Sequence, residues 1–219
     1  MSDSPGGGRA FFASDALEVA PRLLGARLAL AGPDGEVEVR ITEVEAYHGV
    51  GTSGVYDPGS HSKDRLTPRN ASMFGPPGHA YVYFSYGMHF AINMVCSPEG
   101  VASGVLIRSG AVTRGIEIAR ARRVARRSTV PPDAHLARGP GNLAAALGVT
   151  RPLHDGLDLL APPFTFSPAS DPPASTRSGP RVGVAGEAGG PAFPWRFWID
   201  GDPTVSVFRP GRGAPTTPR

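Results

Sequence analysis

Two glutamates, Glu43 and Glu45, lie two residues apart near the end of the segment EVEVRITEVEAY at 36–47, which has strand-like alternation. Side chains of a strand point alternately to its two faces. The inner face is defined by three aliphatic residues, Val37, Val39 and Ile41. Continuing the same parity places both carboxylates on the side that enters the core. The opposite face becomes apolar at Val44 and Ala46, so we expect this end of the strand to be covered on both sides.

A carboxylate in such a place must be paired or hydrogen-bonded, because burial otherwise raises its pKa. Enzymes make general bases in this kind of environment. The alternative is a structural role, in which the carboxylates pair with buried arginines such as Arg69 or Arg108. We favour the structural role for Glu43 and leave both roles open for Glu45. Residues two apart on a strand lie side by side, so the pair does not fit the two-carboxylate arrangement of ordinary glycoside hydrolysis.

A second candidate region is aromatic, YVYFSYGMHFAIN at 81–93. Tyr81 and Tyr83 share one face of a strand, whereas Tyr86 breaks that parity directly before a glycine. A hairpin tip carrying Tyr86 and Met88 could enter a DNA groove and separate stacked bases, and the basic TPRN lies just upstream. Tyr81 or Tyr83 could stack on a base. The alternative is a tyrosine-rich core strand, which we favour for Tyr81.

Other types of site find little support in the sequence. The six histidines have no metal-ligand spacing and Cys96 has no partner cysteine, so we expect no metal site. No Walker loop, dinucleotide-binding glycine motif or serine-hydrolase motif occurs. GPGN at 139–142 could present backbone amides to a phosphate at a helix start, although an ordinary turn into a helix is the favoured interpretation.

Composition indicates one globular, soluble domain in 219 residues, with 40% hydrophobic and 8% aromatic residues. No apolar run is long enough to span a membrane, and the N-terminus lacks the features of a secretory signal. One cysteine fits a reducing cytoplasm. The net charge is +3, and Lys63 is the sole lysine among 22 basic residues. Six arginines between Arg114 and Arg127 form either a phosphate-binding cluster or a solvated helix face.

The expected elements follow from periodicity and from Gly and Pro positions. Two short helices are expected over 14–25, with Ser14 as N-cap and the second beginning at Pro21, and another from Thr67. Further helices are expected at 112–127 and 139–148. Strands are expected at 27–31, 36–47, 79–85, 89–96, 101–108, 181–184, 195–199 and 204–208, whereas 49–63 and 162–180 are expected to be loops.

These elements do not alternate regularly between strand and helix. We therefore predict an α+β fold rather than a doubly wound sheet. The expected form is a single domain over 11–209, with a curved mixed or antiparallel sheet, surrounding helices and a protruding β-hairpin. The ends, 1–10 and 210–219, are rich in Gly, Pro, Ser and Thr and are expected to be disordered tails.

Several segments together resemble the alkyladenine (3-methyladenine) DNA glycosylases of the mammalian type. They are EVEAY, HSKDRLTPRNASMFGPPGHAYVYFSYGMHFAIN, GVLIRSGA, GPGNLAAALG and RVGV, in matching order over nearly all of 11–209. The resemblance implies base excision repair by a monofunctional enzyme that needs no metal or organic cofactor. Such an enzyme flips an alkylated or deaminated purine out of duplex DNA and hydrolyses its N-glycosidic bond, which leaves an abasic site. It would act as a monomer in the cytoplasm, at the bacterial nucleoid.

The resemblance also implies roles for individual residues. Glu45 would be the general base that activates water, and Arg108 would help to hold that water and the phosphate around it. The flipped purine would be bound by Tyr47, His61, Tyr83 and Asn93, with Asn93 excluding the exocyclic amine of guanine. The DNA would be contacted by the wedge Tyr86 and by Met88, Arg65, Arg69, Gly141 and Asn142.

Two departures from the family pattern stand out. The stretch between Glu45 and His61 is several residues longer than in vertebrate relatives, and Asn142 stands where many relatives have a basic residue. Two other functions compete with a DNA glycosylase: a non-catalytic nucleic-acid binding module and a small-molecule nucleoside hydrolase. A binding module has no use for a carboxylate on the buried side, and a free nucleoside needs no wedge to flip it.

Overall fold

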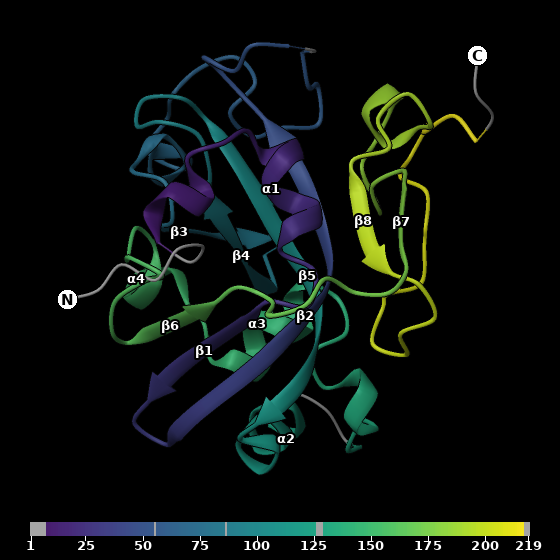
Figure 1. Ribbon diagram of the computed structural model, residues 1–219. Coiled ribbons are helices and arrows are strands. Elements are labelled where there is room, and N and C mark those ends of the chain that lie inside the picture. The colour runs from purple at the N-terminus through teal and green to yellow at the C-terminus, as the bar shows by residue number, and fades with distance from the viewer. Residues whose placement is uncertain (1–7, 55, 86, 126–128, 217–219) are drawn as a thin grey trace.

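The computed structural model describes residues 8–54, 56–85, 87–125 and 129–216 (Figure 1). In these residues, eight strands form one curved antiparallel sheet: β1 Arg27–Gly32, β2 Gly35–His48, β3 Ala80–Ser85, β4 His89–Val95, β5 Ser103–Arg114, β6 Phe164–Ser167, β7 Thr176–Gly179 and β8 Arg196–Ile199. The α-helices are α1 Ala16–Arg22, α2 Ile116–Val124, α3 Pro140–Leu147 and α4 Arg151–His154. Short 3-10 helices lie at Arg9–Phe12, Ala71–Phe74, Asp133–His135 and Glu187–Gly189. The predicted α+β class is confirmed.

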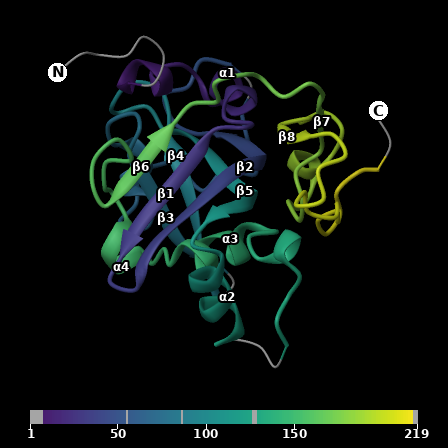
Figure 2. The same cartoon turned by 60° about the horizontal axis from the view of Figure 1, so that its bottom comes forward.

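Strand β2 is the centre of the sheet, and one of its edges is shared by two partners. β5 pairs along one edge over residues 38–48, while β1 pairs with residues 35–40 on the other edge. β8 then pairs with residues 43–45 on the edge that β1 has left. The main path runs β3-β4-β5-β2-β1-β6, and β7 lies beyond β8. In both views β7 and β8 lie on the opposite side of β2 from β3 and β4 (Figures 1 and 2), so the end of β2 is enclosed.

The parity of β2 changes halfway along the strand. The β2–β5 register shifts between Ile41 and Glu43 and again between Glu43 and Val44. Irregularities of this kind re-aim the side chains that follow them. The core residues of β2 are accordingly Val37, Val39 and Ile41 before the shift, and Val44 and Ala46 after it. The predicted facing of Glu43 and Glu45 is therefore wrong: they lie opposite the main core, although both are fully buried as expected.

The helices cover the core side of this sheet. α1 packs against β2 and β5, and α3 packs against β4 and β5. α2 lies against α3 at one end of the sheet (Figure 2). The apolar side chains buried between these layers remove a large area from water, which is the main force that holds such a domain together. None of the helices in the described part of the chain is long and apolar enough to cross a membrane.

Several helix predictions need correction. Residues 16–22 form one helix that contains Pro21, and its N-cap is Asp15 rather than Ser14, with the Asp15 side chain accepting from the Leu17 amide. The helix expected from Thr67 is absent from this segment, where only Ala71–Phe74 is helical, as a 3-10 turn. The Asn70 side chain explains this, because its Oδ1 accepts from the Thr67 amide at 2.6 Å and favours a local turn.

Strand predictions fail in the C-terminal third. The expected loop at 162–180 contains β6 and β7, while the segments 181–184 and 204–208 are not strands. Their amides serve other partners: the Val182 amide donates to Glu45 Oε1 at 2.6 Å and the Ser206 amide donates to Glu43 Oε2 at 2.7 Å. Buried carboxylates compete here with sheet pairing for the backbone donors.

Described residues within both predicted tails contact the rest of the chain. Arg9 donates to the Pro77 carbonyl at 2.7 Å and forms an ion pair with Asp158 at 2.6 Å. Near the other end, the Arg212 carbonyl accepts a hydrogen bond from the Gly186 amide at 3.1 Å. The remaining tail residues, 1–7 and 217–219, lie outside the described residues.

Glu43 provides a test of what encloses the end of β2, because this fully buried carboxylate faces the guanidinium groups of Arg108 and Arg196. Glu43→Gln removes the carboxylate partner of Arg196 and leaves Arg108 paired with Glu45 alone. We therefore expect a loss of about 3–5 kcal/mol in the free energy of unfolding. Urea unfolding at pH 7 measures this loss. Glu36→Gln, on the same strand but with 38% of the Glu36 side chain exposed, is the control and should change stability by less than about 1 kcal/mol.

The stability difference between wild type and Glu43→Gln should depend on pH. The folded-state pKa of Glu43 lies below the ordinary value of 4.5. Its contribution to stability is therefore present above pH 4.5 and is lost as the pH falls through the folded pKa. The stability difference between wild type and Glu43→Gln should narrow in acid, and a difference that stays constant down to acid unfolding would contradict this origin.

Candidate active site

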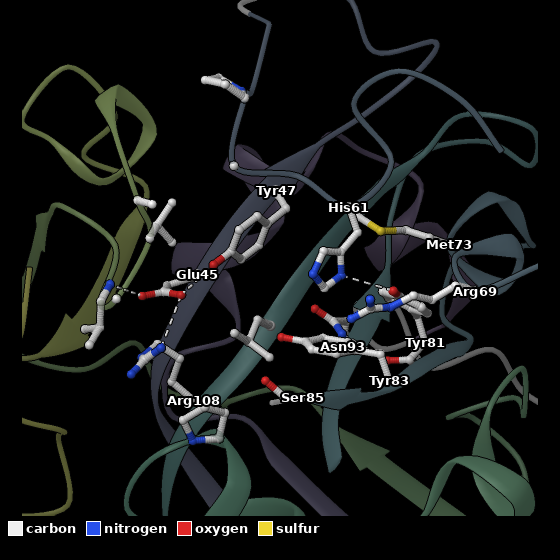
Figure 3. A pocket seen from close by; sticks show the side chains of 18 residues that line it. Glu45, Tyr47, His61, Arg69, Met73, Tyr81, Tyr83, Ser85, Asn93 and Arg108 are labelled. Atoms are coloured by element: carbon white, nitrogen blue, oxygen red, sulfur yellow. Dashed lines mark hydrogen bonds and ion pairs between the residues drawn. The ribbon is translucent and has the colours of Figure 1, made fainter. Parts of the chain in front are cut away.

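A cavity of about 470 Å³ opens on the face of the sheet opposite the main core (Figure 3). Strands β2, β3, β4 and β5 supply one wall, and the segments around residues 58–61, 69–73 and 182–185 supply the rest together with Pro140 at the start of α3. It brings together seven residues named from the sequence: Glu45, Tyr47, His61, Arg69, Tyr83, Asn93 and Arg108. Its volume is in the range of sites that bind small molecules or single nucleobases.

Glu45 is fully buried at one side of the cavity, and three donors hold its carboxylate. Tyr47 Oη donates to Oε2 at 2.8 Å, and Arg108 Nη1 donates to the same oxygen at 3.3 Å. The Val182 amide donates to Oε1 at 2.6 Å. Both oxygens are therefore fixed in orientation by groups from three separate parts of the chain.

Glu43 supports this arrangement without lining the cavity. Its carboxylate accepts from Arg108 Nε at 2.9 Å and from Arg196 Nε at 2.7 Å. It also accepts from the Ser109 hydroxyl and from the amide and hydroxyl of Ser206. Burial alone would raise the pKa of Glu43, but the attraction of the two guanidinium groups and these hydrogen bonds outweigh it and lower the pKa. The structural role favoured for Glu43 is confirmed, and through Arg108 it orients the group that contacts Glu45.

The opposite side of the cavity is aromatic (Figure 3). The His61 and Tyr83 rings meet edge to face, with centroids 4.7 Å apart, and Tyr81 lies 5.6 Å from Tyr83. His61 Nδ1 and Tyr81 Oη are 3.2 Å apart, within hydrogen-bond distance. Tyr81 is buried in a second, smaller core cluster with Met73 and Val95, as expected from its preferred core role, and its side chain also lines the cavity.

The pKa of His61 is lowered, first by the loss of water around its imidazole and second by the positive charge of Arg69, although the residue as a whole is exposed. Both causes disfavour the protonated imidazole. Arg69 lines the cavity, and its positive charge lowers the pKa of His61 there. For Tyr81, burial outweighs the lowering effect of the same charge and raises the pKa to about 12. Around neutral pH the aromatic wall accordingly presents an uncharged imidazole and an uncharged phenol.

Asn93 and Tyr47 complete the wall. Asn93 is buried, and its Nδ2 donates to the Tyr81 carbonyl at 3.0 Å, which fixes the plane of the amide. Burial, followed by the nearby Glu45 carboxylate, raises the pKa of Tyr47, so its hydroxyl remains a donor to Glu45. Among the described residues, no three His, Cys, Asp or Glu side chains form a group that could hold a metal ion.

Of the described residues named as DNA contacts, Arg69 alone lines the cavity. Tyr86 lies outside the described residues. It is flanked by Ser85, which lines the cavity, and by Gly87, whose φ of +67° fits a tight turn. Met88 beyond the turn is 65% exposed, and Arg65 is also exposed.

The start of α3 is more constrained than the sequence indicates. Gly141 approaches the His89 ring so closely that an added Cβ would lie 2.9 Å from it. The Asn142 Nδ2 donates to the Arg138 carbonyl at 2.6 Å, and its Oδ1 accepts from the guanidinium of Arg123. Asn142 therefore stabilises the turn into the helix, and a cation from α2 lies against it.

The other arginines described in the 114–127 cluster form ion pairs at the protein surface. Arg114 pairs with Glu36 and Glu38, Arg120 with Glu117 and Asp133, and Arg122 with Asp34. These contacts favour the solvated helix face over a phosphate-binding cluster. Arg126 and Arg127 lie outside the described residues.

Sequence reasoning missed Arg181, Val182 and Asp57. Val182 and Arg181 belong to the RVGV segment, whose alternation resembles a strand, and Asp57 lies in a loop without periodicity. The RVGV match to the resembled family was the available signal for this segment. No sequence signal indicated that Asp57 would form an ion pair with Arg181.

The electrostatic effect of Arg69 can be measured directly. Arg69→Gln removes the cation but leaves the desolvation of the His61 imidazole, so the pKa of His61 should rise toward its ordinary value. An NMR titration of the imidazole resonances measures this change. His154, whose pKa is also lowered by burial, is an internal control that should not move. An unchanged or lower pKa for His61 would show that Arg69 does not act on it.

Comparison with known proteins places this geometry in a family. The family model of methylpurine-DNA glycosylase matches residues 10–203. A protein of Streptomyces avermitilis is 53% identical over 205 residues, covering 92% of this chain and 91% of the relative. A protein of Leifsonia xyli is 49% identical over 203 residues, covering 92% of both chains. Both carry the name "Putative 3-methyladenine DNA glycosylase".

The family match covers nearly the whole described chain, and it includes both walls of the cavity. Both relatives are also well above the identity at which family membership is secure. The chain therefore belongs to the methylpurine-DNA glycosylase family, and it is a DNA glycosylase that hydrolyses N-glycosyl bonds in base excision repair.

Proposed function

We propose that the chain excises alkylated or deaminated purines from duplex DNA after flipping the damaged nucleotide into the cavity. The observation that carries this proposal is the Glu45 carboxylate, fully buried and held by three donors, at the edge of an aromatic cavity of about 470 Å³. A carboxylate on one side and stacking surfaces on the other suit a base that must be gripped while its sugar is attacked. The names of the relatives point to 3-methyladenine as one substrate.

In this mechanism Glu45 is the general base. It takes a proton from a water molecule while the water oxygen attacks the anomeric carbon, and the bonding electron pair leaves with the purine. Positive charge develops on the sugar as the bond breaks, and the carboxylate stabilises that charge. Arg108 and the Val182 amide keep the carboxylate oriented, and Tyr47 donates to the oxygen that Arg108 also contacts. No step requires a metal or an organic cofactor.

The flipped purine is held by Tyr47, His61 and Tyr83, with stacking from the aromatic rings and recognition of its edge near His61. The low pKa of His61 supports this role, since an uncharged imidazole does not repel a cationic purine. Asn93 sits with its amide plane fixed by the Tyr81 carbonyl, where it would clash with the exocyclic amine of unmodified guanine. Flipping itself costs least for damaged or mispaired bases and so adds selectivity.

Duplex DNA is engaged by the hairpin and the surfaces beside it. Tyr86 fills the space that the flipped nucleotide leaves, and the exposed Met88 contacts the groove next to it. Arg65 and Arg69 lie on the segment that precedes the hairpin, and Gly141 and Asn142 bring the start of α3 near a phosphate. The enzyme acts as a monomer over residues 11–209, at the nucleoid in the cytoplasm.

Glu45→Gln keeps the size of the side chain but removes the base. We expect this variant to bind damaged duplex as wild type does and to release purine about 10²- to 10⁴-fold more slowly. Single-turnover release from a lesion duplex, with binding measured separately, gives both numbers. Glu38→Gln, on the same strand outside the cavity, should leave release unchanged. Release at nearly the wild-type rate by Glu45→Gln would overturn the assignment and favour a binding module.

Tyr86→Ala tests the wedge. Without a side chain to replace the extruded base, excision from fully paired duplex should fall more than excision from mispaired or single-stranded sites, where flipping costs little. Rates on matched oligonucleotides that differ only in the opposing base measure the ratio. An equal loss on both kinds of site would contradict a wedge.

A further inference from the structure

A buried ion pair lies directly behind the cavity. The side chains of Arg181 and Asp57 are both fully buried, and they meet in a two-point contact at 2.6 and 2.7 Å. Arg181 also donates to the carbonyl oxygens of Ala46 and Ala188. Asp57 belongs to the stretch between Glu45 and His61. The mechanism derived so far uses neither residue.

The guanidinium of Arg181 lies against the Tyr47 ring, with its central carbon 4.5 Å from the ring centroid. Tyr47 lines the cavity, whereas the fully buried Arg181 does not. The cation therefore covers the ring face that is turned away from the cavity. The other face of the same ring is the one on which a flipped purine would stack.

A cation on one face of a tyrosine changes what the other face attracts. The ring quadrupole attracts cations on both faces, but two cations on opposite faces also repel each other. They lie within about a Debye length, 8 Å at physiological ionic strength, and the site is buried, so salt screens the repulsion poorly. Asp57 offsets part of the Arg181 charge. The guanidinium is the group that contacts the Tyr47 ring, so its charge acts more strongly there than the charge of Asp57.

The other charged groups at the cavity add to this repulsion of cationic purines. The carboxylate and guanidinium groups that line it are Glu45, Arg69 and Arg108, one anion and two cations. Glu45 is already engaged by Arg108. A purine that carries a positive charge, such as 7-methylguanine, is therefore repelled by the guanidinium groups at the cavity wall. A neutral purine of similar size, such as hypoxanthine, does not experience this repulsion.

We propose that Arg181 is a specificity-determining residue that lowers the affinity of the cavity for cationic purines relative to neutral ones, and that Asp57 sets the strength of this effect. The inference rests on the proposed stacking of the purine on Tyr47. Arg181 also has a positioning role, because the amide of the next residue, Val182, donates to Glu45. The test must therefore separate charge from geometry.

Binding without cleavage achieves this separation. Duplexes that carry the 2′-fluoro nucleotide of 7-methylguanine or of hypoxanthine resist hydrolysis, so dissociation constants can be measured for the wild type and each variant. An undamaged duplex gives the nonspecific reference. The quantity of interest is the ratio of affinities, cationic over neutral. Because each ratio is measured within one variant, the fraction of folded protein cancels.

Two single variants should move the ratio in opposite directions. Arg181→Met removes the cation and should raise the ratio about threefold or more, whereas Asp57→Asn leaves the cation uncompensated and should lower it by a similar factor. Arg181→Lys keeps the charge but loses the two-point contact, so it should weaken both affinities and leave the ratio near that of wild type. Arg181→Met/Asp57→Leu removes both members of the pair, so neither charge is left buried without its partner. This double variant should therefore fold if the first single variant does not, and its ratio should also rise.

The outcomes are distinct. Ratios that do not move, or that move in the same direction for Arg181→Met and Asp57→Asn, would overturn the inference and leave Arg181 a purely structural residue. If the wild type binds neither lesion duplex more tightly than undamaged DNA, the proposed function itself fails. Tighter binding of both lesions with an unmoved ratio contradicts only the inference.

Discussion

The structure depends on one constraint: two carboxylates at the end of β2 are fully buried, and each must be compensated where it lies. The Glu43 carboxylate accepts hydrogen bonds from Arg108 of β5, from Arg196 of β8 and from the Ser206 amide. Glu45 draws the amide of Val182. Apart from the contact with Arg108, these contacts join parts of the chain that are more than 130 residues apart, and they close the end of the sheet around the cavity.

The two carboxylates lie on the same strand but have different surroundings. Glu43 receives donors from two guanidinium groups, two hydroxyls and an amide, which holds it as a fixed anion and leaves no capacity for chemistry. Glu45 receives fewer donors and lines the cavity. Arg108 bridges the two, so the anchoring of Glu43 also determines the orientation of Glu45. The register shift in β2 matters for the same reason, because it turns both carboxylates away from the main core.

Much of this was accessible from the sequence. Alternation predicted β2, β3 and β4 and the burial of both glutamates, and the motif resemblance named seven residues that the fold brings to one cavity. The parity change in β2 left a trace in the pattern, because the apolar positions switch face between Ile41 and Val44. The same switch also fits a strand that is covered on both sides, so the pattern alone did not distinguish the two. Arg181 and the Ser206 amide were missed for a related reason. Their segments alternate like strands, but distant carboxylates capture their polar groups, and such long-range competition is invisible to local periodicity.

The central claim is that the cavity receives a flipped purine with its sugar beside Glu45. A crystal structure of the enzyme with a duplex that contains a cleavage-resistant 2′-fluoro hypoxanthine nucleotide tests it most directly. We predict the purine between Tyr47 and the His61 and Tyr83 rings, with the anomeric carbon separated from the Glu45 carboxylate by one water molecule. A purine that remains stacked in the duplex, or a sugar out of reach of a water bound to Glu45, would contradict the account.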